Sequence, residues 1–409
     1  MVELRRRFRS GRVLPSPFRL LALAVVFGST AGSCTSTPAP DFVRESRQIV
    51  GWLHTEGTRL VDAEGRSVTL EGIQVGGFAA GAGARGDRGV ALTGCPGWQP
   101  LAHSTYHDVR AWGFNSVRMA ISWANIEPSP PRSTGGGRLE HDYNAEYLKA
   151  VDAAIQGFAR VGIAVVLEFG QSGWSPAFKH VAMKYGPGCQ GVGMPSWLYP
   201  GGQTSSTAPR RAFFDNAANV QQGYIDAWQM VAARYANVPT VVGFDIFNEP
   251  PTSRYFTPAD LHLADLYDRL GAAIRSVNRR ALLIFQDVGP TAGVGEALSS
   301  PPPLGNVVYS FHFYPDDWDP HGRATLMAQW ERALLWGTPL YVGETDAFGY
   351  ASPHPRDPRW AADTQAMLAF CGQSGISWNI FQDAGRWFLA ADTGRPKPGL
   401  LTVLQTGSS

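Results

Sequence analysis

The segment from residue 221 to residue 250, QQGYIDAWQMVAARYANVPTVVGFDIFNEP, shows the unit from which most of the chain is built. Its first half, Gln221–Tyr235, carries apolar residues at the spacing of an amphipathic helix. Its second half, Thr240–Phe247, is a short run of β-branched and aromatic residues, which is typical of a buried strand. A helix followed at once by a buried strand predicts parallel strands joined by helical crossovers.

Seven further apolar runs of this kind occur, and helix-period stretches such as Tyr143–Val161 lie between them. The other predicted strands are Leu70–Val75, Asn115–Met119, Ile163–Leu167, Ala281–Phe285, Val307–Phe311, Pro339–Gly343 and Ile376–Phe381. Eight strands alternating with helices predict an α/β fold, the closed (β/α)8 TIM barrel. An open doubly wound sheet is the competing fold, but no GxGxxG motif follows the first strand and the strand count favours closure.

Two features elaborate this predicted barrel. Apolar and polar residues alternate from Trp52 to Val75 around Glu64-Gly65, which predicts an N-terminal β-hairpin leading into the first barrel strand. Long segments follow the first and third strands, at Gly76–Ala102 and Gly170–Phe214. Because the loops after the strands form the active face of such a barrel, these long βα loops predict an elaborated binding cleft.

The N-terminal residues have the layout of a secretory signal. Six arginines precede the apolar run Leu20–Gly28, and the small residues Ser29–Ser33 follow it. The segment from Thr30 to Cys34 resembles a bacterial lipobox, which predicts a lipid on Cys34; ordinary cleavage nearby and release is the alternative. We expect residues 1–33 to be a signal peptide, 34–50 a tether and 51–409 the barrel, in an exported protein that is extracellular or attached to the cell envelope.

The charge of the chain bears on its partners. The formal net charge is +1, and removal of residues 1–33, with six arginines and one glutamate, would leave about −4. Neither value gives the basic footprint of a nucleic-acid-binding protein. No run of 18 or more apolar residues occurs, which excludes a bundle of membrane-spanning helices. We expect a monomer without a nucleic-acid partner, in contact with a membrane only through a lipid on Cys34.

The four cysteines give no pattern of metal ligands. Cys95 and Cys189 lie in loops rich in Gly and Pro, and they are the pair we expect to form a disulfide in an exported protein. Cys371 lies in an apolar stretch and is predicted to be a buried free thiol. No CxxC motif or His/Cys ligand spacing occurs, so we expect no metal site and no cofactor.

Polar residues at the ends of the predicted strands are the candidate site residues, because barrel enzymes place catalytic groups there. They are Arg118, Glu168, Asn248, Glu249, Gln286, Asp287, His312, Tyr314, Glu344 and Trp378. Glu249 is followed by Pro250, which cannot extend a strand and turns the chain outward. Glu344 follows Gly343, which lets the backbone approach its neighbours.

Two carboxylates at the ends of nearby strands are what hydrolysis of a glycosidic bond requires. One must be protonated to assist the leaving oxygen, which calls for a raised pKa, and the other must be ionised to attack the anomeric carbon. The alternative is that Glu249 or Glu344 is only a buried salt-bridge partner of Arg118. None of the four lysines ends a predicted strand, so Schiff-base chemistry is excluded.

The same residues lie in motifs that resemble glycoside hydrolase family 5 of clan A. In chain order these are GFNSVR at 113–118, SW at 122–123 with EP at 127–128, FNEP at 247–250, FHFY at 311–314, GE at 343–344 and SW at 377–378. The resemblance covers roughly Trp52–Leu404. It implies a retaining double-displacement mechanism with Glu249 as the acid/base and Glu344 as the nucleophile.

The resemblance also implies roles for the supporting residues. Asn248 would bind the sugar 2-hydroxyl, His312 would contact the acid/base, and Tyr314 would contact the nucleophile. Arg118 would hold the nucleophile ionised, and Trp378 would form the platform under the −1 sugar.

One position departs from the family, which usually carries a histidine at the end of the third strand. Gly170 stands there in the segment LEFGQ, and Glu168 is a third carboxylate on the active face. Glu168 either replaces the lost sugar contact or is structural. The departure bears on substrate preference more than on the reaction.

The resemblance implies a carbohydrate or glycolipid substrate and leaves two substrate classes open. The first is a β-linked polysaccharide or oligosaccharide, as for a cellulase-like endo-β-glucanase. The second is a glycolipid cut by an endoglycoceramidase-like enzyme, which the segments Ile121–Trp123, Ile126–Pro128 and Val242–Pro250 also resemble. A function of another class, an inactive carbohydrate-binding lipoprotein, is disfavoured because both glutamates are present. Two or three loop tryptophans are expected to stack on sugars, from the set Trp98, Trp174, Trp197, Trp318 and Trp387.

Overall fold

The computed structural model describes thirteen stretches of the 409-residue chain. They are residues 48–76, 78–79, 98, 100–134, 139–171, 174–178, 193–200, 207–251, 256–288, 297–348, 358–381, 388 and 395–407. The predicted signal peptide, nearly all of the predicted tether, the cysteines Cys34, Cys95 and Cys189, and Trp387 lie outside the described residues. The predictions made for them stay predictions.

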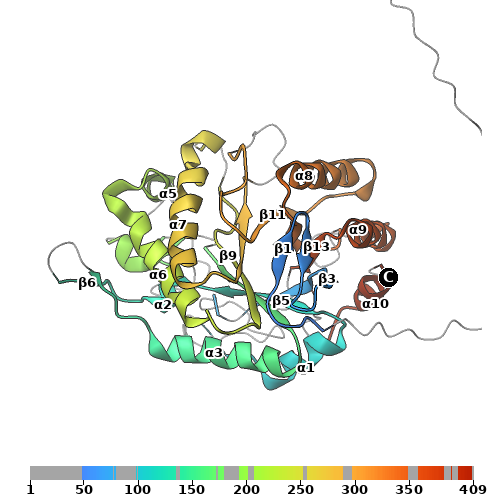
Figure 1. Cartoon of the computed structure of the whole chain (residues 1–409), viewed down its shortest axis with the longest axis horizontal. Coiled ribbons are helices and arrows are strands. Elements are labelled where there is room, and N and C mark those ends of the chain that lie inside the picture. Colours follow the sequence, from blue (N-terminus) through green and yellow to red (C-terminus); the bar gives the residue numbers. More distant parts are fainter. Residues whose placement is uncertain are drawn as a thin grey trace, which may run out of the picture. The chain divides into compact units, whose positions relative to one another are not determined.

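Eight parallel strands close into a barrel, which confirms the predicted fold (Figure 1). In order around the barrel they are β4 (Glu71–Val75), β5 (Ser116–Ile121), β8 (Ala164–Phe169), β9 (Val241–Asp245), β10 (Leu282–Gln286), β11 (Val307–Phe313), β12 (Leu340–Thr345) and β13 (Ser377–Ile380). Each coincides with one of the eight predicted apolar runs. Apart from the partly exposed Glu71 at the start of β4, the strands are buried along their whole length, as expected where helices cover a parallel sheet.

The helices surround the strands in Figure 1. The α-helices are α1 (His103–Ala111), α2 (Trp123–Ile126), α3 (Ala145–Arg160), α5 (Thr207–Phe214), α6 (Val220–Arg234), α7 (Leu263–Val277), α8 (Arg323–Trp336), α9 (Trp360–Ser374) and α10 (Leu400–Gly407). Short single-turn segments are η2 (Ser196–Leu198), η3 (Ala217–Asn219), η4 (Pro258–Leu261) and η5 (Trp318–Gly322). Helix α3 shows why these segments are helical. Asn144 caps its first turn by accepting a hydrogen bond from the Tyr147 N–H, and buried residues recur at Tyr147, Val151 and Ile155.

A small antiparallel sheet precedes the barrel. It consists of β1 (His54–Glu56), β2 (Arg59–Val61) and β3 (Ser67–Val68). The predicted hairpin is β2–β3; the sequence pattern did not separate β1, which turns into β2 at Gly57 with a φ of 57°. Leu53 and Leu60 pack in one apolar cluster with inward-facing barrel residues such as Val166 and Ile284. The small sheet therefore covers one end of the barrel interior.

A second elaboration follows α2. The strands β6 (Arg132–Ser133) and β7 (Leu139–Glu140) form a two-stranded antiparallel ribbon that the sequence analysis did not predict. Two residues in each strand are too few to show alternation. In the described residues, no helix is both long and apolar enough to cross a membrane. Cys371 is buried and free, which confirms the prediction for this thiol.

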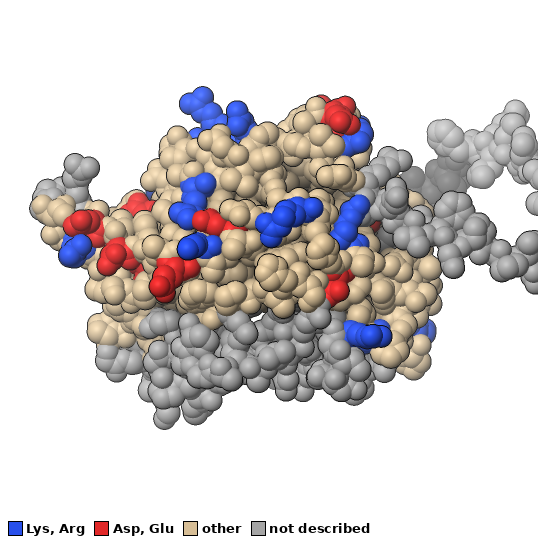
Figure 2. Space-filling model, turned by 90° about the horizontal axis from the view of Figure 1, so that it is seen from below, with Lys and Arg blue, Asp and Glu red and all other residues tan. Residues whose placement is uncertain are grey.

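The charged side chains on one face of the molecule are few. On the face in Figure 2, lysines and arginines are interspersed with acidic residues among a majority of other residues. The described residues on this face form no continuous basic stripe of the kind that tracks a phosphate backbone.

The packing between barrel and helices generates a test of the fold. Trp228 on α6 is fully buried, stacks on Phe169 at 3.9 Å between ring centroids and donates from Nε1 to the Ile246 carbonyl at 3.1 Å. Trp228→Ala should lower the free energy of unfolding by about 3–5 kcal/mol, because it leaves a cavity in the core; the Ile246 carbonyl keeps the Tyr224 hydroxyl as a hydrogen-bond donor. Urea denaturation measures this. The control Leu335→Ala, on a side chain that is 87% exposed, should stay within about 0.5 kcal/mol. A loss below about 1 kcal/mol for Trp228→Ala would contradict this packing.

Candidate active site

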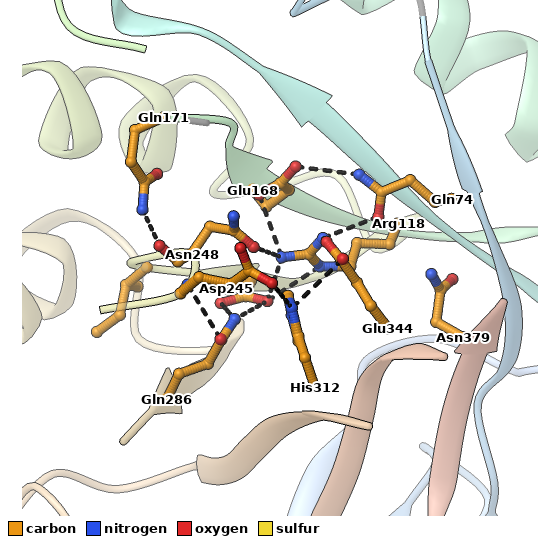
Figure 3. Close-up of polar contacts among 12 residues, drawn as sticks. Gln74, Arg118, Glu168, Gln171, Asp245, Asn248, Gln286, His312, Glu344 and Asn379 are labelled. Carbon is orange, nitrogen blue, oxygen red and sulfur yellow. Dashed lines mark hydrogen bonds and ion pairs between the residues drawn. The ribbon is translucent and has the colours of Figure 1, made fainter. Parts of the chain in front are cut away.

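Arg118 on β5 lies at the centre of the candidate site, with its side chain fully buried (Figure 3). Its five N–H groups have five acceptors from four other strands and the segment after β9. The acceptors are Asp245 at 3.0 Å from Nε, Gln74 at 2.8 Å and Glu344 at 2.7 Å from Nη1, and Glu168 at 3.1 Å and Asn248 at 2.7 Å from Nη2. Every donor of the guanidinium is therefore used.

Three carboxylates share this one cation. Glu168, Asp245 and Glu344 all form ion pairs with Arg118, and their side chains are between 0% and 8% exposed. The acids raise the pKa of Arg118 well above its ordinary value, although burial acts in the opposite direction. Glu344 therefore forms the ion pair with Arg118 that the sequence analysis considered for either glutamate, whereas no ion pair joins Glu249 to Arg118 among the described contacts.

Irregular strand pairing aims two of these acids into the barrel. Along β9 the pairing with β8 skips one residue, from Val165↔Val241 to Val166↔Gly243. Val242 and Asp245 both face the interior although they lie three positions apart, which strict alternation forbids. One extra residue reverses the faces, as β-bulges do.

Strand β12 contains the second irregularity. His312 pairs with Glu344 where regular pairing would give Gly343, so one residue is extra. A Cβ at Gly343 would lie 2.8 Å from Ser310 Oγ and 3.1 Å from His312 Nε2. Glycine therefore lets the bulge fit and turns the Glu344 carboxylate toward Arg118.

Glu249 lies just after β9 and faces Glu344 across the barrel mouth. Its φ of 44° is unusual for a residue with a side chain, and its N–H donates to Gln286 Oε1 at 3.1 Å, which supports this conformation. His312 Nδ1 lies 2.8 Å from Glu249 Oε1 and 3.3 Å from Glu344 Oε2. The structure thus brings both predicted carboxylates to one imidazole.

The protonation of this group differs from the expectation for Glu249. The hydrogen bond with His312 holds the pKa of Glu249 below its ordinary value, although burial opposes this, so the raised pKa predicted for the acid is wrong in this structure. Burial lowers the pKa of His312, but the charge of Glu344 and the hydrogen bond with Glu249 outweigh it, and the pKa is raised. Both directions favour an ionised Glu249 beside a protonated His312.

Tyr314 orients the second oxygen of Glu344. Its hydroxyl donates to Glu344 Oε2 at 2.6 Å, while Arg118 holds Oε1. One carboxylate oxygen from each of Glu249 and Glu344, together with a His312 nitrogen, lie within 4.8 Å of one another. These atoms are close enough to hold a metal ion, although hydrogen bonds between His312 and Glu249 and between Tyr314 and Glu344 already pair these side chains within the protein.

Glu168 of β8 pairs with the same guanidinium as Glu344, and it is 3% exposed. Its Oε2 accepts from Arg118, and its Oε1 accepts from Gln74 Nε2 at 3.1 Å. Burial, opposed by Arg118, raises the pKa of Glu168 to about 7. Of the two predicted roles, the contacts support a structural one, because both oxygens already have partners. A Cβ at Gly170 would lie 3.6 Å from Glu168 Oε1, so the glycine position borders this buried group.

Several residues of this network were not among the predicted site residues. Asp245 accepts from Gln286 Nε2 with both oxygens at 3.1 Å, and Gln171 Nε2 donates to the Asn248 carbonyl. Asp245 and Gln74 lie inside predicted strands rather than at their ends. A polar residue within a buried barrel strand was the signal that could have identified them. Figure 3 shows Gln74 and Asn248 beside the guanidinium, Gln286 beside Asp245, and Gln171 beside Asn248.

Two predicted strand-end residues lie elsewhere. Asp287 accepts from Arg332 Nη2 at 2.6 Å and from loop N–H groups, so it anchors a loop. Trp378 lies on the opposite face of β13 from Asn379, is 3% exposed, and its ring meets Phe114 edge-on at 6.3 Å. The structure therefore contradicts the predicted platform role of Trp378. The aromatic ring of this segment that lies next to the site is Phe381, 6.5 Å from Tyr314.

Most of the described loop tryptophans pack inside the molecule. Trp174 donates to the Tyr199 hydroxyl at 2.9 Å, Trp98 stacks on Phe78, and Trp318 is 8% exposed. Trp197 instead lines a cavity of about 950 Å³ beside α6, whose lining does not include the site carboxylates. The predicted use of two or three of these rings as sugar platforms has no support from the described residues.

Comparisons with known proteins agree with this geometry. The family model "Cellulase (glycosyl hydrolase family 5)" matches residues 61–383. An endoglucanase of Paenibacillus polymyxa is 24% identical over 336 residues, which cover 73% of this chain and 72% of that protein. An endoglycoceramidase of Hydra vulgaris is 24% identical over 255 residues, 50% of this chain and 45% of that protein, so the match spans less than half of the Hydra protein.

A solved structure shares the fold. The lactosyl-enzyme intermediate of endo-glycoceramidase II from Rhodococcus sp. aligns with a TM-score of 0.64 at 22% identity. The alignment covers 84% of this chain and 80% of that chain.

The Arg118 contacts generate a test of the site's architecture. Arg118→Met should lower the free energy of unfolding by about 3–5 kcal/mol at neutral pH, because it leaves buried carboxylates without their cation. Arg234→Met is the matched control: Arg234 pairs with Asp152 at the surface, where the side chains are 36% and 28% exposed, and it should cost at most about 1 kcal/mol. Chemical denaturation compares the two variants. Equal losses would contradict the central role of Arg118.

Proposed function

Because the chain belongs to the cellulase family, glycosyl hydrolase family 5, we propose that it is a retaining endo-β-glycosidase that acts on a β-linked glucan or related oligosaccharide. Glu344 is the nucleophile and Glu249 the acid/base. The observation that carries this proposal is the facing of these two carboxylates, with one oxygen of each within 4.8 Å of the other. Retaining enzymes hold the pair roughly 5–5.5 Å apart, whereas inverting enzymes leave roughly 6.5–9.5 Å for a water molecule.

The first step uses the hydrogen bonds on Glu344. Arg118 stabilises the ionised carboxylate through Oε1, and Tyr314 fixes Oε2. Attack on the anomeric carbon forms a glycosyl ester with Glu344, and the bond to the leaving oxygen breaks. Glu249 gives its proton to that oxygen, so an alcohol departs and no charged fragment is released.

The second step reverses the role of Glu249. As a carboxylate it takes a proton from water, the water oxygen bonds to the anomeric carbon, and the ester bond to Glu344 breaks. Two inversions at the same carbon retain the β-configuration. Asn248 supports both steps: its Oδ1 accepts from Arg118, which leaves its amide nitrogen as the donor that can reach a sugar hydroxyl.

Substrate binding supplies the protonation that Glu249 needs. Its side chain is 53% exposed in the unliganded site, where the hydrogen bond with His312 favours the ionised form. A sugar that covers Glu249 would remove water from it, and desolvation favours a neutral carboxyl group. A proton on His312 Nδ1 would then move to Glu249 Oε1 across their 2.8 Å hydrogen bond.

The choice between the two substrate classes rests on how much of this chain each sequence relative covers. By sequence, the Paenibacillus endoglucanase aligns over 73% of this chain and the Hydra endoglycoceramidase over 50%, which favours a β-glucan over a glycolipid; the 84% alignment with endo-glycoceramidase II reflects the shared fold. A panel of β-glucans, mannan, xylan, aryl glycosides and a ganglioside tests this choice. The highest kcat/KM on a β-glucan supports the proposal, and a preference for the ganglioside would establish the glycolipid alternative. Proton NMR of the early products should show the β-anomer first.

The place of action is a further part of the proposal. The basic and apolar run within residues 1–33 supports export, and Cys34 at the end of the lipobox-like segment supports attachment to the cell envelope through a lipid. The chain would then meet its glycan outside the cytoplasm. Mass spectrometry of the mature N-terminus tests both points.

The nucleophile assignment predicts a selective loss of activity. Glu344→Gln should reduce hydrolysis of an aryl β-glycoside by at least about 10⁴-fold, because an amide cannot form the glycosyl ester. Circular dichroism and thermal unfolding check that the variant is folded. Asp346→Asn, two residues along and also buried, is the matched control and should retain activity within about tenfold. Turnover by folded Glu344→Gln close to the wild-type rate would refute the assignment.

The acid/base assignment predicts a dependence on the leaving group. Glu249→Ala should lose roughly 10²–10⁴-fold in kcat/KM on glycosides with alkyl leaving groups, which need a proton. It should lose far less on a dinitrophenyl glycoside, whose leaving group departs as a stable anion. Glu344→Gln should lose activity on both substrates. Equal losses on both substrates for Glu249→Ala would mean that Glu249 is not the acid.

A further inference from the structure

We propose that Glu168 stores the one proton that the Arg118 cluster must retain, and that Glu168 is thereby a positioning residue for the nucleophile. The activity part of this inference rests on the proposed function; the proton itself does not. The inference begins from a charge count. One guanidinium contacts three carboxyl groups, and all four side chains are at most 8% exposed.

A cluster with all three acids ionised would carry two uncompensated negative charges in a buried site. Burial of unpaired charge is costly, and carboxyl groups in such clusters respond by keeping a proton. Neighbouring carboxylates push one member of the group toward its neutral form, as in other acid pairs that share a site. The geometry therefore calls for a proton on Glu168, Asp245 or Glu344.

The hydrogen bonds decide which acid keeps it. Asp245 receives Arg118 Nε and two contacts from Gln286 Nε2. Glu344 receives short bonds from Arg118 at 2.7 Å and Tyr314 at 2.6 Å, with His312 at 3.3 Å. Glu168 receives two longer bonds, both at 3.1 Å, so its ionised form is the least stabilised of the three.

The electrostatic surroundings agree. Burial raises the pKa of Glu168 to about 7; Arg118 opposes this, and the charges of Glu344 and Asp245 add to it. The titratable groups that face Glu168 are Arg118 of β5, Asp245 of β9, Glu344 and Tyr341 of β12, and Tyr224 of α6. Arg118 is the cation of this set.

The protonation of Glu168 bears on the nucleophile through Arg118. While Glu168 is neutral, Asp245 and Glu344 are the two carboxylates that pair with the guanidinium, and the cluster carries one uncompensated negative charge instead of two. Once Glu168 ionises, a third carboxylate competes for Nη2, and a new negative charge lies near the site where Glu344 must stay ionised and oriented. Activity should therefore fall as the pH rises through about 7.

The sign for stability follows from the same shift. The folded chain keeps the Glu168 proton up to a pH of about 7, whereas an unfolded glutamate loses it near its ordinary value of 4.5. This stabilisation is complete below pH 4.5 and is lost as the pH rises to about 7 and beyond. A variant with a permanently neutral side chain should not show this loss.

The experiment compares Glu168→Gln, Glu168→Asp and Glu127→Gln with the wild type. Glu127 is the matched control, because it is fully buried and hydrogen-bonded to Trp123 and His141, outside the Arg118 cluster. Activity is measured as kcat/KM from pH 6 to 8.5, and the free energy of unfolding is measured from pH 5 to 8. Infrared spectroscopy follows the carbonyl stretch of buried, protonated carboxyl groups over the same range.

The ratio of kcat/KM of Glu168→Gln to that of the wild type should rise at least about threefold from pH 6 to 8.5. Glu168→Asp, which keeps a titratable group, should follow the wild type, and the ratio for Glu127→Gln should stay flat. The infrared band should disappear near pH 7 in the wild type and be absent in Glu168→Gln. A flat ratio, or a folded Glu168→Gln that is inactive at every pH, would overturn the inference.

Two further outcomes keep the test decisive. If Glu168→Gln does not fold, the wild-type infrared titration decides: a band that is lost near pH 7 supports the stored proton, and its absence at pH 6 overturns it. If the wild type hydrolyses no glycoside, the proposed function fails. The infrared and unfolding measurements then still decide the protonation of Glu168, so the two failures are distinguishable.

Discussion

A single buried guanidinium holds the candidate site together. Arg118 reaches across the barrel interior, and its five donors tie β5 to β4, β8, β9 and β12 and to the segment that carries Asn248. No water is needed to explain its burial, because each N–H has a protein acceptor. The acceptors are in turn held by amides such as Gln74 and Gln286, so the position of the nucleophile depends on side chains from most of the barrel.

The chemistry follows from how charge is distributed around that cation. Glu344 has its two oxygens fixed by different donors, whereas Glu249 is half exposed and is hydrogen-bonded to His312 through one oxygen. The two carboxylates therefore differ in mobility and in contact with solvent, although they lie close together. Arg118 and Tyr314 hold Glu344 in place, whereas the exposed part of Glu249 can be covered by a bound sugar.

The sequence alone was enough to predict the barrel and most of the residues of the site. Continuous apolar runs predict buried parallel strands, whichever strands pair with each other. Most of the site residues end such runs or lie next to their ends: Arg118, Glu249, His312, Tyr314 and Glu344. The roles that failed depend on which face of a strand a residue occupies. Trp378 was assigned to the site from its motif, but it faces the helices. The lowered pKa of Glu249 depends on the His312 contact, which only the folded structure specifies.

The bulges in β9 and β12 limit how the site could be grafted onto another barrel protein. In a barrel of idealised strands, the side chains at Asp245 and Glu344 would point outward, since strict alternation from Val242 and Tyr341 places them on the wrong face. Grafting the acidic residues alone onto such a scaffold would bury them among the helices. Each acidic residue would have to be transferred together with the bulged strand that carries it. The extra residue in β9 and in β12 is therefore as necessary for the site as the carboxylates of Asp245 and Glu344.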